Sequence, residues 1–305
     1  MKDGSVQCVE ILSDSTNKMT DQAICLSAEQ KATLLELYGN RSTQEGLLCG
    51  TVQDFCDSCD NIPFLAGIQG DLKDLQRPAA LKAILGLCRP GDSVLEVGAG
   101  EPHVAHILTE LGYIVTVVDP YDGSGRGPTE FEQYRSKYPK VRMVRANFSD
   151  QVSGIEVSGF ECIYSISVLE HVHEPELSSV FAGIRRFLRP AGYSLHLIDH
   201  VLAGDGAQFH LEQLSEIVSH QAGLSGKTIA HAVASVIAVF NQAAADLDTY
   251  YLSAEGHNRW RGTLPYSSFP FRKVISIRSC ERYTSDHSLI SGHAPGEELD
   301  CSGHG

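Results

Sequence analysis

The chain has 305 residues, of which 42% are hydrophobic and 20% are charged, a balance typical of globular proteins with a sizeable buried core. Its 38 acidic and 24 basic residues give a formal net charge of −14, which argues against nucleic acid and acidic membranes as partners. The sequence shows neither a signal peptide nor an apolar window of membrane-spanning length, so we expect a cytoplasmic protein without a membrane partner.

The N-terminal quarter divides into an arm and a helical segment. Residues 1–26 are polar and lack a sustained period, which predicts a flexible arm. Ser27 suits the N-cap of a helix, and we expect helices over 27–77, including one near 51–59. Cys56 and Cys59 form a CxxC pair, which leaves open a metal or redox pair on one hand and a plain helix surface on the other. The nine cysteines are scattered, which does not indicate a disulfide framework.

A glycine turn between two apolar strands follows. We expect a helix over 78–87, then the strand 93–97, which breaks at Gly98 and Gly100 before a helical pattern. A second strand, 113–118, ends on Asp119. This βαβ unit predicts a nucleoside site, because glycines let a ligand approach the backbone and the acid can accept hydrogen bonds from ribose hydroxyls.

The acids near this turn discriminate between two cofactor classes. A dinucleotide site would carry a third glycine where His103 stands, and Glu101, two residues before it, disfavours a phosphate. Glu96 places a carboxylate inside the turn, which would repel a pyrophosphate and suits a cationic aminoacyl sulfonium. The pattern therefore favours S-adenosylmethionine over NAD.

The remaining segments complete an alternating α/β pattern. The glycine-rich loop 122–128 either closes over a cofactor or is a surface connection, and a helix is expected over 129–138. A strand and the turn that follows it are expected over 160–172, and further strands over 193–198 and 271–278. Between the last two, apolar-faced helices over 207–247 predict a lid insertion of about 205–262. The polar residues 283–305 are expected to form a disordered tail.

The run Glu96-Val97-Gly98-Ala99-Gly100 resembles the signature of class I S-adenosylmethionine-dependent methyltransferases of the bacterial small-molecule type. The resemblance covers roughly residues 80 to 200. It implies a Rossmann-like doubly wound α/β sheet, mostly parallel with one antiparallel strand, with the methyltransferase domain over 78–282 and the N-terminal helices capping the cofactor. Asn147 departs from the pattern, since many members have Asp there.

The resemblance also implies a set of cofactor-binding residues around the carboxyl ends of the strands. The set is Glu96, Gly98, Ala99, Gly100, Asp119, Pro120, Asn147, Phe148, Ser165 and Glu170.

Catalytic candidates follow the fourth and fifth strands of the βαβ series. His200 and Asp199 end the strand 193–198, where active residues of α/β sheets gather, and His200 is a candidate base or metal ligand. A structural histidine is the alternative. A magnesium site of Asp199, His200 and Asp205 is also left open. His171 is a third catalytic candidate, or else a residue that stabilises its turn.

A cluster over 250–262 combines aromatic rings with polar groups. Tyr251, His257, Arg259 and Trp260 are candidate substrate-binding residues, because rings offer flat faces and Arg a bidentate fork. The alternative is a loop that packs on the lid.

These features predict an S-adenosylmethionine-dependent methyltransferase that acts on an oxygen or nitrogen of a small molecule, such as a sugar or a secondary-metabolite intermediate. The alternatives are an NAD-dependent oxidoreductase or epimerase, and a non-catalytic binding protein of the same fold. The sequence does not specify the oligomeric state, the acceptor atom or the metal dependence.

Overall fold

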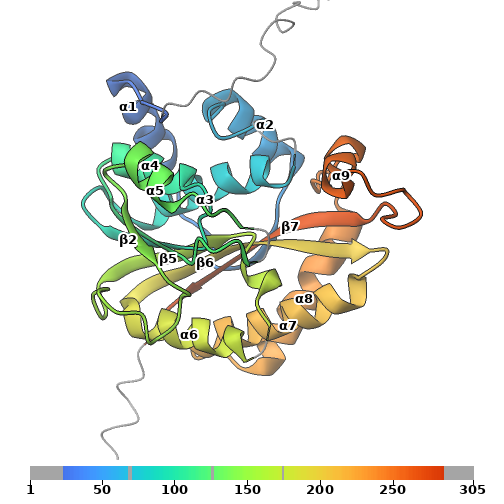
Figure 1. Ribbon diagram of the computed structural model, residues 1–305. Helices are drawn as coiled ribbons and strands as arrows, with labels where there is room; N and C mark the ends of the chain where they lie inside the picture. The colour runs from blue at the N-terminus through green and yellow to red at the C-terminus, as the bar shows by residue number, and fades with distance from the viewer. Residues whose placement is uncertain (1–22, 68–70, 125–126, 174, 285–305) are drawn as a thin grey trace, which may run out of the picture.

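A central sheet organises the molecule. The computed structural model describes residues 23–67, 71–124, 127–173 and 175–284. In these residues a seven-stranded sheet has the order β1-β7-β6-β5-β2-β3-β4 (Figure 1). The strands are β1 (Gly46–Cys49), β2 (Ser93–Val97), β3 (Ile114–Asp119), β4 (Arg142–Arg145), β5 (Phe160–Ile166), β6 (Leu188–Ala203) and β7 (Lys273–Arg282).

The strand directions confirm the predicted doubly wound sheet. Strands β2 to β6 are mutually parallel, and β7 runs antiparallel to both of its neighbours, β6 and β1. From β2 the chain builds outward through β3 and β4, then returns to the other side of β2 to form β5 and β6. The order of strands therefore reverses between β2 and β5, and ligands of open α/β sheets bind at such a reversal, beyond the carboxyl ends of the strands.

Helices cover both faces of the sheet. Figure 1 shows α1 to α5 above it and α6 to α8 below it. The helices are α1 (Ala28–Tyr38), α2 (Val52–Asn61), α3 (Lys73–Leu87), α4 (His103–Glu110), α5 (Phe131–Lys137), α6 (Glu176–Phe187), α7 (Ala207–Leu224), α8 (Ile229–Ala245) and α9 (Ala254–Arg261), with a short 3-10 turn η2 (Leu169–His171).

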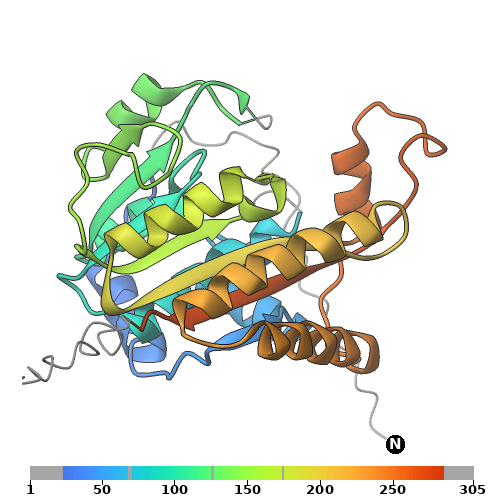
Figure 2. The same cartoon turned by 90° about the horizontal axis from the view of Figure 1, so that it is seen from below.

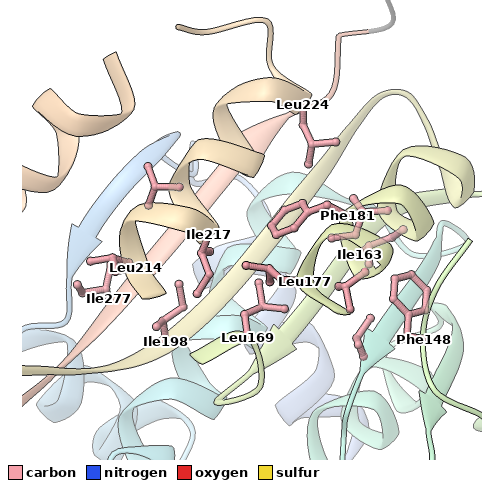
Figure 3. Close-up of a cluster of buried hydrophobic side chains, with 14 of the residues drawn as sticks. Phe148, Ile163, Leu169, Leu177, Phe181, Ile198, Leu214, Ile217, Leu224 and Ile277 are labelled. Atoms are coloured by element: carbon pink, nitrogen blue, oxygen red, sulfur yellow. The ribbon is translucent and has the colours of Figure 1, made fainter. Parts of the chain in front are cut away.

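Two hydrophobic cores lie on opposite faces of the sheet. Because side chains alternate along a strand, Ile163 of β5 joins the core beneath α6 and α7, and its neighbour Tyr164 joins the core beneath α3 and α4. Figure 3 shows the first core, in which Leu177 and Phe181 of α6 meet Ile217 of α7. Burial of apolar area on both faces accounts for most of the favourable free energy of folding.

Helices α1 and α2 each begin at a capping side chain. Ser27 caps α1 through a capping box with Gln30, as predicted, and Thr51 caps α2 in the same way. Packed structure begins before residue 27, because Leu26 is buried and the carbonyl of Ile24 lies 2.6 Å from the ring Nε2 of His106. The part of the expected arm over 1–22 and the tail over 285–305 lie outside the described residues.

The segment 27–77, expected to be helical, also contributes a strand. Residues 46–49 form β1, which pairs with β7 and supplies one edge of the main sheet. Four residues are too few for a period to show in the sequence, so this pairing with a strand more than 200 residues away was not predicted.

The segment expected as a lid, about 205–262, divides into two parts. Helix α7 packs on β6 and β7, and α8 packs on α7 and β1, so both cover the lower face of the sheet (Figure 2). Their apolar residues meet the core beneath the sheet, which is why they do not lie over the ligand cleft. Only α9 contributes a residue to that cleft. None of the described helices has both the length and the hydropathy of a transmembrane span.

Leu177→Ala tests the packing of the lower core. Leu177 is fully buried, and its truncation should lower the free energy of unfolding by about 2 to 5 kcal/mol through lost burial and a residual cavity. Urea unfolding followed by circular dichroism measures the change. Leu264, which is 48% exposed, supplies the matched control, since Leu264→Ala should change stability by less than about 0.5 kcal/mol. Equal losses in both variants would contradict this assignment of the core.

Candidate functional site

A cleft opens beyond the carboxyl ends of β2, β3, β5 and β6, at the reversal of strand order. Its volume is about 1130 Å³. Eight of the ten predicted cofactor residues line it. They are Glu96, Gly98, Ala99, Gly100, Asp119, Pro120, Asn147 and Phe148. The glycine-rich loop also reaches the cleft through Ser124, Gly127 and Pro128, while residues 125 and 126 lie outside the described part of the chain.

The glycine turn has a geometry that requires glycine. Gly98 and Gly100 have φ angles of +66° and +58°, in the left-handed region that side chains disfavour. A Cβ on Gly98 would stand 2.8 Å from a methyl of Val168. At this turn, backbone without side chains therefore packs against Val168, in the connection that follows β5, and also lines the cleft.

Asp119 holds this turn in place. One carboxylate oxygen accepts the N–H of Gly100 at 3.0 Å, and the other accepts the N–H of Tyr121 at 2.8 Å. The hydroxyl of Tyr121 in turn donates to the carbonyl of Gly100 at 3.0 Å. Asp119 lines the cleft, so its carboxylate orders the turn and faces the place predicted for the ribose.

Glu96 is a buried acid at the cleft wall. It is 3% exposed, and the hydroxyl of Tyr164 donates to its carboxylate at 2.8 Å. Burial raises the pKa of Glu96 to about 7, and the charge of Asp119 adds to the shift, although Arg77 and the hydrogen bond from Tyr164 oppose it. The site thus contains a carboxyl that titrates near neutral pH and that a bound cation would hold ionised.

Arg77 is a cleft residue that the sequence analysis missed. It is 8% exposed, and its Nη1 has no hydrogen-bond partner among the described residues. Burial lowers the pKa of the guanidinium, and the charges of Asp71 and Glu96 oppose this shift. The expected helix begins at Pro78, whereas α3 begins at Lys73. Arg77 therefore lies inside α3, on a turn of helix that the sequence did not predict. A buried guanidinium with a free N–H is suited to an anion.

Asp199, Ser167 and His171 also line the cleft. Asp199 of β6 accepts the side-chain amide of Gln76 at 2.7 Å and the hydroxyl of Ser167 at 3.2 Å. Burial raises the pKa of Asp199 above its ordinary value, while Gln76 and Lys73 oppose the shift. For His171, burial and the charge of Lys73 lower the pKa of the ring.

Two predicted cofactor residues do not line the cleft. Glu170 is buried beneath it, where one carboxyl oxygen accepts the main-chain N–H of Asp199 at 2.8 Å. Burial and the nearby charge of Asp199 raise the pKa of Glu170. Ser165 has no exposed surface, and its hydroxyl bonds to the ring of His196 at 2.8 Å. Both side chains lie in the interior, and their role in cofactor binding stays a prediction.

His200, the first catalytic candidate, lies on the opposite face of the sheet. It is 1% exposed, with its ring 4.8 Å from that of Phe240 and 6.0 Å from that of His210. Burial lowers the pKa of its ring to about 4. Strand β6 continues to Ala203, so the alternation of side chains sends Asp199 to the cleft and His200 beneath α8. This position favours the alternative of a structural histidine over that of a base.

The predicted substrate residues are not together. Trp260 lines the cleft, but His257 is buried and stacks on Phe269 with ring centroids 5.5 Å apart. Arg259 forms an exposed ion pair with Glu255, and the hydroxyl of Tyr251 donates to the carbonyl of Ala243. Tyr251 precedes α9, and the other three side chains leave that short helix in different directions, so only one of the four candidates reaches the cleft.

No metal centre is assembled in the described part of the chain. It contains no group of three His, Cys, Asp or Glu residues suited to a metal ion, and His200 points away from Asp199. Cys56 and Cys59 are exposed on α2, and burial together with the neighbouring thiol raises the pKa of Cys59. A raised pKa disfavours the reactive thiolate, which favours the interpretation of this pair as a helix surface.

Comparison with known proteins identifies the family. A family model described as a methyltransferase domain matches residues 64–247, more than half of the chain. The protein therefore belongs to the methyltransferase family that the glycine turn resembles, the class I S-adenosylmethionine-dependent enzymes. A search of curated proteins found no match to the sequence.

Several solved methyltransferase structures are similar in fold. Phosphoethanolamine N-methyltransferase 2 of Haemonchus contortus, in complex with S-adenosyl-L-methionine, is 15% identical, with coverage of 84% of this chain and 74% of that one and a TM-score of 0.43. The 1,6-didemethyltoxoflavin-N1-methyltransferase of Burkholderia thailandensis is 19% identical, with 87% and 93% coverage and a TM-score of 0.39. Geranyl diphosphate methyltransferase is 16% identical, with 81% and 92% coverage and a TM-score of 0.41.

Glu96→Gln should raise stability at high pH. Because the pKa of Glu96 rises on folding, its contribution to stability is fully present below the unfolded pKa and is lost as pH rises through about 7. The neutral amide of the variant does not ionise and so does not undergo this loss. The free energy of unfolding of the variant should therefore exceed that of the wild type by about 2 kcal/mol at pH 8 and by little at pH 5. Urea unfolding at both pH values measures the difference. A variant less stable than the wild type at pH 8 would show that Glu96 is not strained by burial.

Proposed function

We propose that the protein transfers a methyl group from S-adenosylmethionine to an oxygen or nitrogen of a small molecule. The proposal rests on one observation. The turn at Gly98 and Gly100, the acids Glu96 and Asp119, and Arg77, whose Nη1 has no hydrogen-bond partner among the described residues, line a single cleft. These groups complement the ribose, the ammonium and the carboxylate of an aminoacyl nucleoside.

Three residues would hold the cofactor. Asp119 would accept the ribose hydroxyls, because its oxygens face the cleft at the end of β3. Arg77 would receive the carboxylate of the amino-acid part through its free N–H. Glu96, ionised by a bound cation, would attract the ammonium. A pyrophosphate would instead meet the negative charges of Glu96, Asp119 and Glu101, and for this reason we do not propose an NAD-dependent activity.

The part of the cleft lined by Asp199, Ser167 and His171 would receive the methyl acceptor. S-adenosylmethionine supplies an activated methyl group on a positively charged sulfur. As the acceptor oxygen or nitrogen bonds to the methyl carbon, the sulfur keeps the electron pair of the broken bond and the acceptor loses a proton. We assign this proton to Asp199 or His171, which both line the cleft. The lowered pKa of His171 keeps its ring neutral and able to accept the proton at neutral pH.

The acceptor end suits a polar small molecule. Lys73, Ser167 and Asp199 offer charged and hydroxyl groups, and Trp260 adds an aromatic wall. A net charge of −14 disfavours a nucleic acid in this cleft. The expectations of a sugar or secondary-metabolite acceptor and of a cytoplasmic location stay predictions. We propose no magnesium ion.

Binding of S-adenosylhomocysteine, the demethylated product, tests the cofactor assignment. Isothermal titration calorimetry should show binding of this nucleoside and none of NADH. Asp119→Ala should weaken the affinity by about 2 to 3 kcal/mol, because the ribose loses hydrogen bonds to a charged group. Glu216→Ala, at an exposed acid of α7 that does not line the cleft, should leave the affinity unchanged. Equal affinities of Asp119→Ala and the wild type would refute the assignment.

Arg77→Met separates the amino-acid part of the ligand from its nucleoside part. Loss of the guanidinium should weaken S-adenosylhomocysteine binding by about 1.5 to 3 kcal/mol. The affinity for 5′-methylthioadenosine, which lacks the amino acid, should not change. Asp119→Ala should weaken both ligands, and this contrast identifies which end of the ligand each residue holds. If Arg77→Met weakened both ligands equally, Arg77 would act on the whole cleft and not on the carboxylate.

A turnover experiment distinguishes a methyltransferase from a non-catalytic binding protein of the same fold. A binding protein would retain the affinity for S-adenosylhomocysteine but would form none of it from S-adenosylmethionine in the presence of a panel of small-molecule acceptors. Mass spectrometry of the acceptors would then locate the transferred methyl group on oxygen or nitrogen.

A further inference from the structure

Asp199 is fixed in the cleft by neighbours that leave one of its oxygens free. The side-chain amide of Gln76, which is 0% exposed, donates to Oδ1 at 2.7 Å. The hydroxyl of Ser167 is shared between the same Oδ1, at 3.2 Å, and Oε1 of Gln76, at 2.8 Å, so the orientation of the amide is set as well. The described residues supply no donor to Oδ2. Asp199 lines the cleft, and its Oδ2 is therefore open to a bound molecule.

Asp199 presents a negative charge to the cleft, although a second carboxyl lies beneath it. Glu170 is 2% exposed, and its Oε1 accepts the main-chain N–H of Asp199 at 2.8 Å. Burial and the charge of Asp199 raise the pKa of Glu170, so Glu170 stays protonated at neutral pH. The hydrogen bonds from Gln76 and Ser167 favour the ionised form of Asp199. Of the two acids, Asp199 is therefore the one that carries the charge.

An aromatic side chain lies near this carboxylate. Val201 follows Asp199 by two residues along β6 and so takes the same face of the strand. Trp260 packs against the hydrophobic cluster that contains Val201 and Leu72, and it also lines the cleft. Figure 1 shows α9, which carries Trp260, near the end of β6. A carboxylate and an indole ring together suit an organic ammonium ion, the first by charge and hydrogen bonding and the second by cation–π attraction.

The charge of the whole cleft also favours a cation. Among the described residues, seven Asp or Glu side chains line the cleft, against two Lys or Arg side chains, Lys73 and Arg77. Burial raises the pKa of Asp71 and the charge of Lys73 opposes this shift, so these two neighbours offset each other in part. Arg77 is assigned to the carboxylate of the cofactor. The sulfonium supplies one positive charge, and the remaining acids attract a second.

An alcohol would use these groups less well than an amine. A neutral hydroxyl gains neither the ion pair with Asp199 nor the cation–π attraction of Trp260. An alcohol is also a far weaker acid than an ammonium ion, so a carboxylate is a poor base for it. An alkylammonium ion titrates near about 10 in water, and a neighbouring sulfonium charge lowers this pKa. The proton of an ammonium ion is therefore within the reach of Asp199.

We propose that the methyl acceptor is the nitrogen of a primary or secondary amine, bound as its ammonium ion by Oδ2 of Asp199 and the ring of Trp260. This inference rests on the proposed function. The ammonium gives one proton to Asp199, and the nitrogen lone pair then forms a bond to the methyl carbon. The bond between this carbon and sulfur breaks, and its electron pair stays on sulfur. The N-methylammonium product leaves with one positive charge, and Asp199 returns its proton to water.

Matched acceptors that differ only in the reacting group test the inference. The panel pairs benzylamine with benzyl alcohol, cyclohexylamine with cyclohexanol, and glucosamine with glucose. Each is incubated with S-adenosylmethionine and the full-length wild-type chain. Mass spectrometry should find methyl groups on the nitrogen of amines and on none of the alcohols. Methylation of alcohols without amines would overturn the inference, and so would methylation of no member of the panel.

Asp199→Asn removes the charge and keeps the size of the side chain. With a methylated amine as the probe, kcat/KM should fall at least about tenfold, because the ammonium loses a charged hydrogen-bond partner. Glu216→Gln is the matched control, since it makes the same change at an exposed acid of α7 that does not line the cleft, and it should behave like the wild type. Wild-type turnover by Asp199→Asn would overturn the assignment.

Two substitutions of Trp260 separate the ring from its apolar bulk. Trp260→Leu should raise KM for the same amine at least about threefold, because the cation loses the face of a ring. Trp260→Phe keeps a ring face and should restore most of the loss. Equal KM values in the wild type and Trp260→Leu would overturn the role of the ring.

The affinity for S-adenosylhomocysteine separates a failure of this inference from a failure of the proposed function. Calorimetry should give the wild-type affinity for the Asp199 and Trp260 variants, which also shows that they are folded. A wild type that does not bind this nucleoside would contradict the cofactor assignment itself. A wild type that binds it and methylates only alcohols would overturn the amine acceptor and leave the cofactor assignment intact.

Discussion

The carboxylate of Asp119 is the contact on which the site depends. Gly100 and Tyr121 each donate a main-chain N–H to it, so the glycine turn after β2 is tied to the end of β3. The two glycines of the turn have left-handed backbone angles, and nothing in their own side chains restricts the chain to that geometry. An acid placed on the neighbouring strand supplies this restriction. The residue that would contact the ribose thus also shapes the surface on which the nucleoside would lie.

Burial destabilises the charged forms of two side chains in the cleft, and a ligand of opposite charge can offset this cost. Glu96 and Arg77 are both largely buried, and in the described part of the chain they do not form an ion pair with each other. Desolvation shifts the pKa values of both toward their neutral forms. A zwitterionic ligand would bring an ammonium to one and a carboxylate to the other. The same burial that destabilises the free protein therefore favours a ligand with paired charges over a neutral nucleoside.

The sequence predicted the features that depend on local spacing. The turn at Gly98 and Gly100 and the acid at Asp119 belong to one βαβ unit, whose geometry is set within about 25 residues. Arg77 was missed because α3 starts before Pro78, inside a segment without a clear period. His200 was misplaced because β6 was expected to end near Ile198, whereas it continues through pairing with β7. Pairing with a distant strand extends β6 and fixes which face each side chain takes, and spacing alone does not reveal it.

The N-terminal strand links the sheet to the wall of the cleft. β1 pairs with β7 at the edge, and the residues that follow β1 hold the connection between α8 and α9: Gly50 accepts the N–H of Tyr250, and Val52 donates to Asp248. This connection leads directly to α9 and Trp260, the one residue of the expected substrate cluster that lines the cleft. The position of Trp260 therefore depends on a four-residue strand near the beginning of the chain. The edge strand, which lies in the segment expected as an N-terminal cap, and the cleft wall are thus joined by the same backbone contacts.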